Sequence, residues 1–132
     1  MKIALLAATL LTISTAAMAF APADYGSEPL ERGGPFPFQG GAAIFKGVCQ
    51  GCHMPDAMGA VGAGMYPALA KDAKLETAGY PVSVVTHGQK AMPDFGSLLN
   101  DQQIADVVNY VRGNFGNKYR DKVTPADVKT QR

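Results

Sequence analysis

Five consecutive residues, Cys49, Gln50, Gly51, Cys52 and His53, constrain the fold of this chain more than any other stretch. Two thiols three positions apart on a helical turn lie on nearly the same face of the helix. Both can therefore bond along one edge of a flat group, and the histidine directly after them can meet a metal at the centre of that group. This C-x-x-C-H pattern is typical of covalent attachment of a c-type haem.

Three other interpretations of the cysteine pair stay open. A tetrahedral zinc site needs four ligands, and the chain has no second cysteine pair and only His53 and His87 as nitrogen ligands. A thioredoxin-like redox pair follows a strand in a βαβ unit, and the run 40–46 does not have the pattern of such a strand. A disulfide between the two cysteines leaves the adjacent histidine without a role.

The first residues predict export. Lys2 is followed by an apolar run at 3–11 and by small residues that end in Ala-Met-Ala at 17–19. This pattern is typical of a secretory signal peptide, here 1–19, and the apolar run is short for a membrane span. We therefore expect a periplasmic protein whose mature chain begins near Phe20 and has no membrane span. An uncleaved anchor at 1–19 is the alternative.

The net charge of the chain argues against some classes of binding partner. The chain has 12 Lys plus Arg and 11 Asp plus Glu, so the loss of Lys2 with the signal peptide leaves a formally neutral mature chain. Nothing in this balance favours binding to nucleic acid or to an anionic membrane surface. The mature length fits one small domain, whose modest core a buried cofactor would enlarge.

The mature chain divides into three parts. Residues 20–39 are rich in proline and glycine and predict an extended arm, in which Phe36 and Phe38 could hold the arm against the domain. Residues 40–113 form the expected domain, and residues 114–132 form a C-terminal extension.

Apolar spacing predicts three helices in the domain. The first covers about 41–49, the second covers 80–87 and ends at Gly88, and the third begins after Asn100. Gln103 stands at the capping-box position of the third helix, and Gly113 predicts its end.

No strand pattern is convincing anywhere in the chain. The stretch 55–68 has little periodicity and predicts a loop. We therefore expect an all-α fold with irregular loops over the faces of the cofactor.

Met92 is the best candidate for a second axial ligand to the haem iron, opposite His53. Pro93 restricts Met92 to an extended backbone, which suits a loop that presents one side chain inward. A thioether is a soft ligand, and a Met/His pair raises the reduction potential of a haem. His87, five positions before Met92, is the alternative ligand.

Together these residues resemble the class I cytochromes c. The resemblance covers about residues 40–112 and rests on Gly41 with Phe45, the C-x-x-C-H motif, Tyr-Pro-Ala-Leu at 66–69, Ala-Met-Pro at 91–93, and Tyr110. It implies a fold in which the N- and C-terminal helices cross around a covalently bound haem, with Tyr110 at the crossing.

The resemblance also implies roles for single residues. Cys49 and Cys52 would hold one haem c, and His53 and Met92 would be the axial ligands of its iron. In the haem pocket, the carbonyl of Pro67 would accept the Nδ1 proton of His53, and Leu69 would pack on the ring.

The end of the chain is similar to the ends of cytochrome domains in periplasmic alcohol and sugar-acid dehydrogenase complexes. This similarity implies an electron-transfer protein, not an enzyme, that works between a quinoprotein or flavoprotein dehydrogenase and a respiratory acceptor. The chain departs from the multihaem members of that group by having one C-x-x-C-H motif, so we expect a monohaem protein, either a diffusible carrier or a dehydrogenase-linked subunit. Two alternatives remain: a haem enzyme or gas binder with an open iron site, and an interaction module in which the cysteines form a disulfide.

Overall fold

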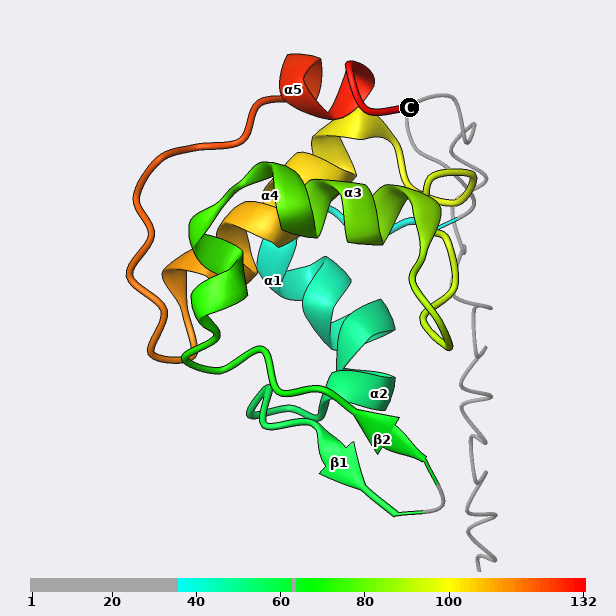
Figure 1. Cartoon of the computed structure of the whole chain (residues 1–132). Coiled ribbons are helices and arrows are strands. Elements are labelled where there is room, and N and C mark those ends of the chain that lie inside the picture. Colours follow the sequence, from blue (N-terminus) through cyan, green and yellow to red (C-terminus); the bar gives the residue numbers. More distant parts are fainter. Residues whose placement is uncertain (1–35, 63) are drawn as a thin grey trace, which may run out of the picture.

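The computed structural model describes residues 36–62 and 64–132 (Figure 1). The expected signal peptide and most of the arm lie outside the described residues. Seven helical elements and two short strands follow one another in the described part: α1 (Gly41–Ile44), the π-helix η1 (Phe45–Cys49), α2 (Gln50–His53), β1 (Ala60–Val61), β2 (Met65–Tyr66), the 3-10 helix η2 (Ala73–Glu76), α3 (Gly79–His87), α4 (Asp101–Gly113) and α5 (Pro125–Lys129). None of these helices is long and apolar enough to cross a membrane.

The α4 helix is the centre of the core. The apolar side chains whose spacing predicts this helix are buried, and they are Ile104, Val107, Val108 and Val111. The predicted capping box is also present: the Asn100 side chain accepts a hydrogen bond from the Gln103 backbone, and the Gln103 side chain accepts one from the Asn100 backbone. The predicted end of the helix at Gly113 is confirmed.

The α1 and α4 helices cross at Gly41. A Cβ atom on Gly41 would lie 2.2 Å from the Asp106 carbonyl oxygen and 2.5 Å from the Cβ of Tyr110, so only glycine permits this approach. Next to the crossing, the ring centroids of Phe45 and Tyr110 are 5.8 Å apart. The helix crossing that the resemblance implied is therefore confirmed.

The α3 helix agrees with its prediction to within one residue. It begins at Gly79, where we expected Tyr80, and it ends at His87. Gly88 then adopts a positive φ of 75°, which glycine tolerates without strain.

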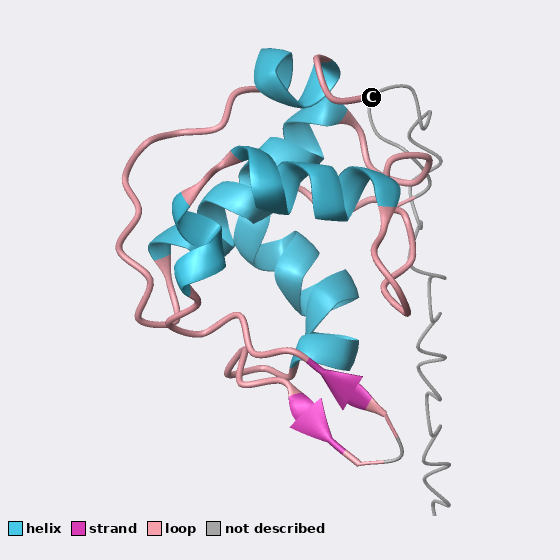
Figure 2. Ribbon diagram, in the orientation of Figure 1, coloured by secondary structure: helices cyan, strands magenta, loops and turns pink. Residues whose placement is uncertain are grey.

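The expectation of a chain without strands is wrong. β1 and β2 form an antiparallel hairpin in which Ala60 pairs with Tyr66 and Val61 with Met65 (Figure 2). Two residues per strand are too few to produce the alternation that identifies a strand in sequence. The fold is therefore mainly helical with one small sheet, inside the stretch we expected to be a loop.

The described end of the arm, at 36–39, and the C-terminal extension both pack on the domain. The Gln103 side chain donates hydrogen bonds of 2.9 Å to the carbonyls of Phe36 and Phe38, and both phenylalanines pack against the core. In the extension, Val123 and Val128 are buried in that core. The sequence pattern did not indicate α5. The domain boundaries that were drawn from the sequence stay a prediction.

Candidate functional site

One unbroken helical run carries the motif. Cys49 ends η1, and α2 continues the helix through His53, four residues beyond the end we predicted. The helix continues because its backbone hydrogen bonds extend past the thiols: the Met54 amide donates to the Gln50 carbonyl at 3.0 Å. Single π-helical turns inside α-helices are frequently found at functional sites.

The structure shows why the helix reaches this position beside the arm. A Cβ atom on Gly47 would lie 2.5 Å from the Phe38 ring, so the glycine lets the ring rest directly on the helix. Nothing in the sequence pattern indicates this role of Gly47, because the contact joins the helix to a proline-rich arm that has no periodic pattern.

Both cysteines are free thiols. Cys52 is exposed and Cys49 is half-buried. Burial, with a smaller contribution from neighbouring Cys52, raises the pKa of the Cys49 thiol to about 12, so this thiol is protonated at neutral pH. In residues 36–62 and 64–132, no group of three or more His, Cys, Asp or Glu side chains is placed to hold a metal ion. The structure therefore gives no support to the zinc and disulfide interpretations.

His53 is buried, with 7% of its surface exposed. Its Nδ1 atom lies 2.9 Å from the Pro67 carbonyl oxygen. Because a carbonyl can only accept a hydrogen bond, Nδ1 carries a proton, so the neutral form of the ring has its lone pair on Nε2. This confirms the hydrogen bond that the resemblance implied, and it leaves Nε2 able to bind a metal.

A tight turn after α2 brings Pro67 to His53. Met54 and Ala57 adopt positive φ angles, of 67° and 59°, in this turn. The amide of Gly59 donates to the His53 carbonyl at 3.0 Å, and a Cβ atom on Gly59 would lie only 2.7 Å from the carbonyl carbon of Pro67. Gly59 thus permits the approach of Pro67, a role that the sequence analysis missed.

Leu69 lies where the turn meets the extension. Its amide donates to the Ala57 carbonyl at 2.8 Å, and its own carbonyl accepts a 2.8 Å hydrogen bond from the Asn117 side chain. The Leu69 side chain is partly buried and packs against the core. Its contact with a haem ring stays a prediction.

Met92 lies on a different part of the chain from His53, in the loop between α3 and α4. Its backbone amide and carbonyl both pair with Gln89 at 3.0 Å, and its side chain is half-buried. The alternative ligand, His87, is exposed, and its Nδ1 atom lies 3.2 Å from the Ser83 carbonyl of its own helix. The local structure therefore favours Met92 over His87, while the ligand role of Met92 stays a prediction.

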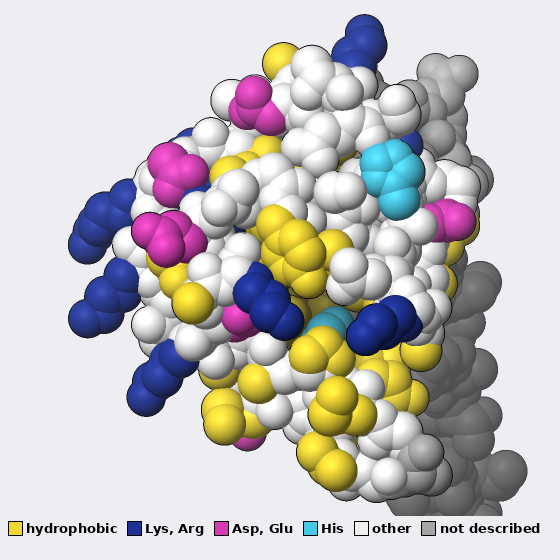
Figure 3. Space-filling view, in the orientation of Figure 1, with side chains coloured by type: hydrophobic (Ala, Val, Ile, Leu, Met, Phe, Trp, Pro, Cys, Tyr) yellow, Lys and Arg dark blue, Asp and Glu magenta, His cyan; other side chains and the backbone are white. Residues whose placement is uncertain are grey.

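Several large apolar side chains are exposed around these elements. Figure 3 shows hydrophobic side chains gathered over the hairpin and on the elements above it. Val61 is 87% exposed and Met65 75%, and the other large exposed ones are Met58, Tyr66 and Tyr80. Exposed apolar patches of this kind mark surfaces that a ligand or a partner covers.

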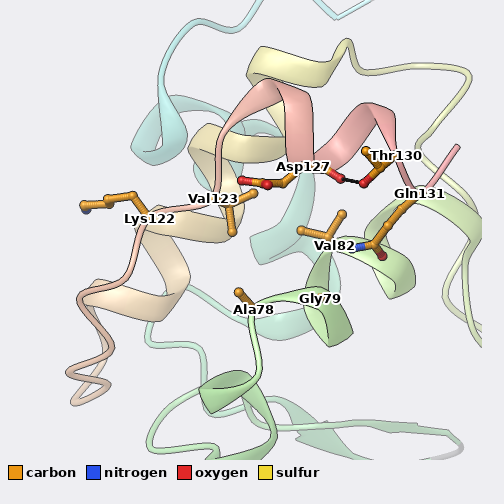
Figure 4. Close-up of a pocket in the computed structure, with 8 residues that line it drawn as sticks. All are labelled: Ala78, Gly79, Val82, Lys122, Val123, Asp127, Thr130 and Gln131. Atoms are coloured by element: carbon orange, nitrogen blue, oxygen red, sulfur yellow. Dashed lines mark hydrogen bonds between the residues drawn. The ribbon is translucent and has the colours of Figure 1, made fainter.

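A separate shallow pocket of about 300 Å³ lies between the start of α3 and α5 (Figure 4). Its acidic group, Asp127, accepts hydrogen bonds from the backbone and hydroxyl of Thr124 at 2.8 Å and 2.7 Å, and these bonds lower the pKa of its carboxyl. No residue of the C-x-x-C-H motif lines this pocket. We therefore place the candidate site at the motif.

Comparison with known proteins agrees with this site. Residues 37–111, more than half of the chain, match the family described as cytochrome C oxidase, cbb3-type, subunit III. The chain belongs to the cytochrome c family. This cytochrome is therefore expected, like its family, to hold haem c covalently, and two free thiols on one helical run with a histidine directly after them fit that group.

Similar proteins are cytochromes from several bacteria. This cytochrome is 38% identical over 101 residues to the cytochrome c subunit of an alcohol dehydrogenase (quinone) from Gluconacetobacter polyoxogenes, covering 67% of this chain and 21% of that protein. It is 35% identical over 108 residues to a gluconate 2-dehydrogenase cytochrome c subunit from Pantoea cypripedii, covering 71% and 24%. Cytochrome c6 of Aphanizomenon flos-aquae is 39% identical over an alignment of 79 residues, with coverage of 54% of this chain and 83% of that protein. The chain thus spans about a fifth to a quarter of the length of the dehydrogenase subunits.

Proposed function

We propose that this chain is a periplasmic, monohaem c-type cytochrome that carries single electrons between a dehydrogenase and a respiratory acceptor and catalyses no reaction itself. The observation that carries the proposal is the orientation of His53: its Nδ1 proton is held by Pro67, and it directly follows the second of two free thiols. A histidine tied back in this way is the usual arrangement of a metal-ligating imidazole.

Haem c, when bound, supplies a reversible one-electron couple at its iron. The residues of this chain then bind and orient it. Cys49 and Cys52 would hold the haem covalently, and His53, through Nε2, and Met92, through its thioether, would be the ligands of its iron. The hydrogen bond to Pro67 raises the basicity of the imidazole, and a ligand set that stays the same in both oxidation states keeps rearrangement small.

Covalent attachment is the first test. The full chain is expressed with an export signal in a host that attaches haem, and a denaturing gel is stained for haem. Wild type and the control Gln50→Ala should keep the stain, while a Cys49→Ser, Cys52→Ser double variant should lose it. An unstained wild-type band would end the cytochrome proposal.

Carbon monoxide distinguishes a carrier from an enzyme or gas binder with an open iron site. The reduced wild-type protein should resist carbon monoxide at neutral pH, because both sides of the iron are occupied. Met92→Ala should bind it readily, whereas the control Met58→Ala removes an exposed methionine and should behave like wild type. Rapid, complete binding by wild type would favour the open-site alternative.

The dehydrogenase partner is proposed from the relatives that are named as subunits of alcohol and gluconate dehydrogenases. The exposed apolar side chains near the motif, Val61 and Met65 among them, suit the small and short-lived contacts of redox proteins. The periplasmic location rests on the signal peptide expected at 1–19. Mixing the ferric protein with a reduced quinoprotein dehydrogenase should reduce it within the turnover time of that enzyme, and no reduction would exclude that class of donor.

A further inference from the structure

We propose that Arg132 is a positioning residue for the loop that presents Met92, so that the segment after α5 controls how firmly the thioether is held. This inference rests on the proposed function, because it concerns the same axial ligand. It assigns a role in the site to a side chain that lies 40 positions beyond Met92 in the sequence.

The Arg132 side chain makes three contacts in one short stretch of chain. Its Nε donates to the Asp101 carboxylate at 2.5 Å, its Nη2 donates to the Leu99 carbonyl at 2.8 Å, and its Nη1 donates to the Gly96 carbonyl. About two thirds of each side chain in the Arg132–Asp101 ion pair is buried. A planar guanidinium presents five N–H donors from three nitrogens in a fixed fork, which suits acceptors that lie apart, whereas the three donors of an ammonium group all leave one nitrogen.

These three acceptors form the base of the Met92 loop. The loop leaves α3 at Gly88 and returns to it, because the Phe95 amide donates to the Val85 carbonyl at 2.9 Å and the Gly96 amide donates to the Thr86 carbonyl at 3.1 Å. Gly96 is therefore held on both sides, by α3 through its amide and by Arg132 through its carbonyl. Opening the loop far enough to release Met92 strains this base.

Arg132 is itself held in place. Val128 of α5 is completely buried, and the Gln131 amide donates to the Val128 carbonyl at 2.9 Å. The Asn109 side chain of α4 binds both backbone groups of Val123, just before α5, at 2.8 Å and 2.9 Å. Figure 1 shows α5 and the residues after it beside the start of α4. The guanidinium thus joins the α4–α5 core to the ligand loop.

The consequence is an effect on ligand exchange. An external ligand such as imidazole can reach the iron only from the conformation in which Met92 has left it, so its apparent affinity follows the population of that open state. Losing a charged donor with three acceptors makes opening easier. The free energy lost with such charged hydrogen bonds corresponds to about a tenfold change in the equilibrium constant between the closed and open states of the loop.

The test is an imidazole titration of the ferric, haem-loaded protein, followed by the charge-transfer band of iron–sulfur ligation. Arg132→Gln should bind imidazole about tenfold more tightly than wild type. Asp101→Asn should shift the affinity in the same direction but less, because the two carbonyl contacts remain. Arg132→Lys should lie between wild type and Arg132→Gln.

Arg120→Gln is the matched control, since it removes the same charge from an exposed side chain of the same extension. Wild-type affinity in Arg132→Gln overturns the proposal, and so does an equal shift in Arg120→Gln. A lower unfolding midpoint in Arg132→Gln with unchanged imidazole affinity shows a structural role alone and also overturns it.

The outcomes separate this proposal from the proposed function. A wild-type protein that carries haem but lacks the iron–sulfur band overturns the Met92 ligand and the role of Arg132 together, while the carrier with another ligand survives. A normal band with no effect of Arg132→Gln overturns the positioning role only.

Discussion

At the scale of single residues, Gly59 decides whether His53 is oriented. Alanine at this position would place its Cβ 2.1 Å from the Tyr66 carbonyl oxygen and would require a φ of 67°. We expect Gly59→Ala to lower the free energy of unfolding by about 2 kcal/mol, because the strain pushes Pro67 away from His53. Urea denaturation measures the loss, and the reduction potential should change as well, because Nδ1 loses its acceptor.

Gly62→Ala is the matched control in the same hairpin. Apart from the neighbours of Gly62 in the chain, no atom of the described residues lies within 4 Å of its Cβ position, and its φ is not in the left-handed region. This variant should keep the stability and the potential of wild type. Equal losses in the two variants would contradict the role given to Gly59.

A second residue-scale prediction concerns Asp121. The Arg112 side chain is fully buried, and its Nη2 donates hydrogen bonds of 2.8 Å to both Asp121 carboxylate oxygens. These hydrogen bonds are the main cause that lowers the pKa of the Asp121 carboxyl. A lowered native pKa means that the carboxylate stabilises the fold fully above the ordinary aspartate pKa, about 4. This contribution to stability is lost as the pH falls through the pKa that the Asp121 carboxyl has in the folded protein.

Asp121→Asn should therefore unfold more easily than wild type at neutral pH. The difference between the two unfolding free energies should shrink in acid, where the wild-type carboxylate is protonated. Urea titrations over a pH series measure this. A difference that stays constant from neutral pH into strong acid would argue against the ion pair as its source.

At the scale of helices and strands, the crossing of α1 and α4 holds the motif against the core. Gly41→Ala should cost about 2 kcal/mol of stability, because the new methyl group overlaps the α4 backbone at Asp106. At Gly113, the end of α4, no described residue outside the same stretch of helix comes within 4 Å of the Cβ position, so Gly113→Ala should leave stability unchanged or slightly raised. Thermal unfolding compares the two, and a neutral Gly41→Ala would show that the helices can separate freely.

Elements with strong local signals were predictable from sequence. The α4 helix has an apolar stripe, a capping box and a terminal glycine, and all three were confirmed. The hairpin was missed because each strand has only two residues, and α5 because five residues are too few to show a helical period.

The residues of the candidate site also fall into those that the sequence indicated and those that it did not. The residues of the C-x-x-C-H motif and Met92 stand out by chemistry and spacing, and the family resemblance supplied the bond between His53 and Pro67. Gly59 and Arg132 could not be found, because their roles arise from contacts between segments far apart in sequence. The ligand roles of His53 and Met92, and the haem-attachment roles of Cys49 and Cys52, are proposals that the variants above address.

At the scale of the whole molecule, the arm and the extension complete the domain from opposite ends of the described chain. Gln103 holds the backbone of the arm, and Arg112 binds the carbonyls of Leu75 and Asp121, at 2.8 Å and 2.6 Å, together with the Asp121 carboxylate. The motif therefore sits in a small domain whose core draws on residues from 36 to 128. Such a scaffold suits a carrier, which must keep one geometry through both oxidation states.

A potentiometric titration of the purified, haem-loaded protein tests the central claim most directly. The carrier should be reduced and reoxidised along the same absorbance curve, with the ratio of oxidised to reduced protein changing tenfold for every 59 mV or so, the slope of a one-electron couple. A two-electron slope, curves that differ between the two directions, or no change of haem absorbance would contradict a single-electron carrier.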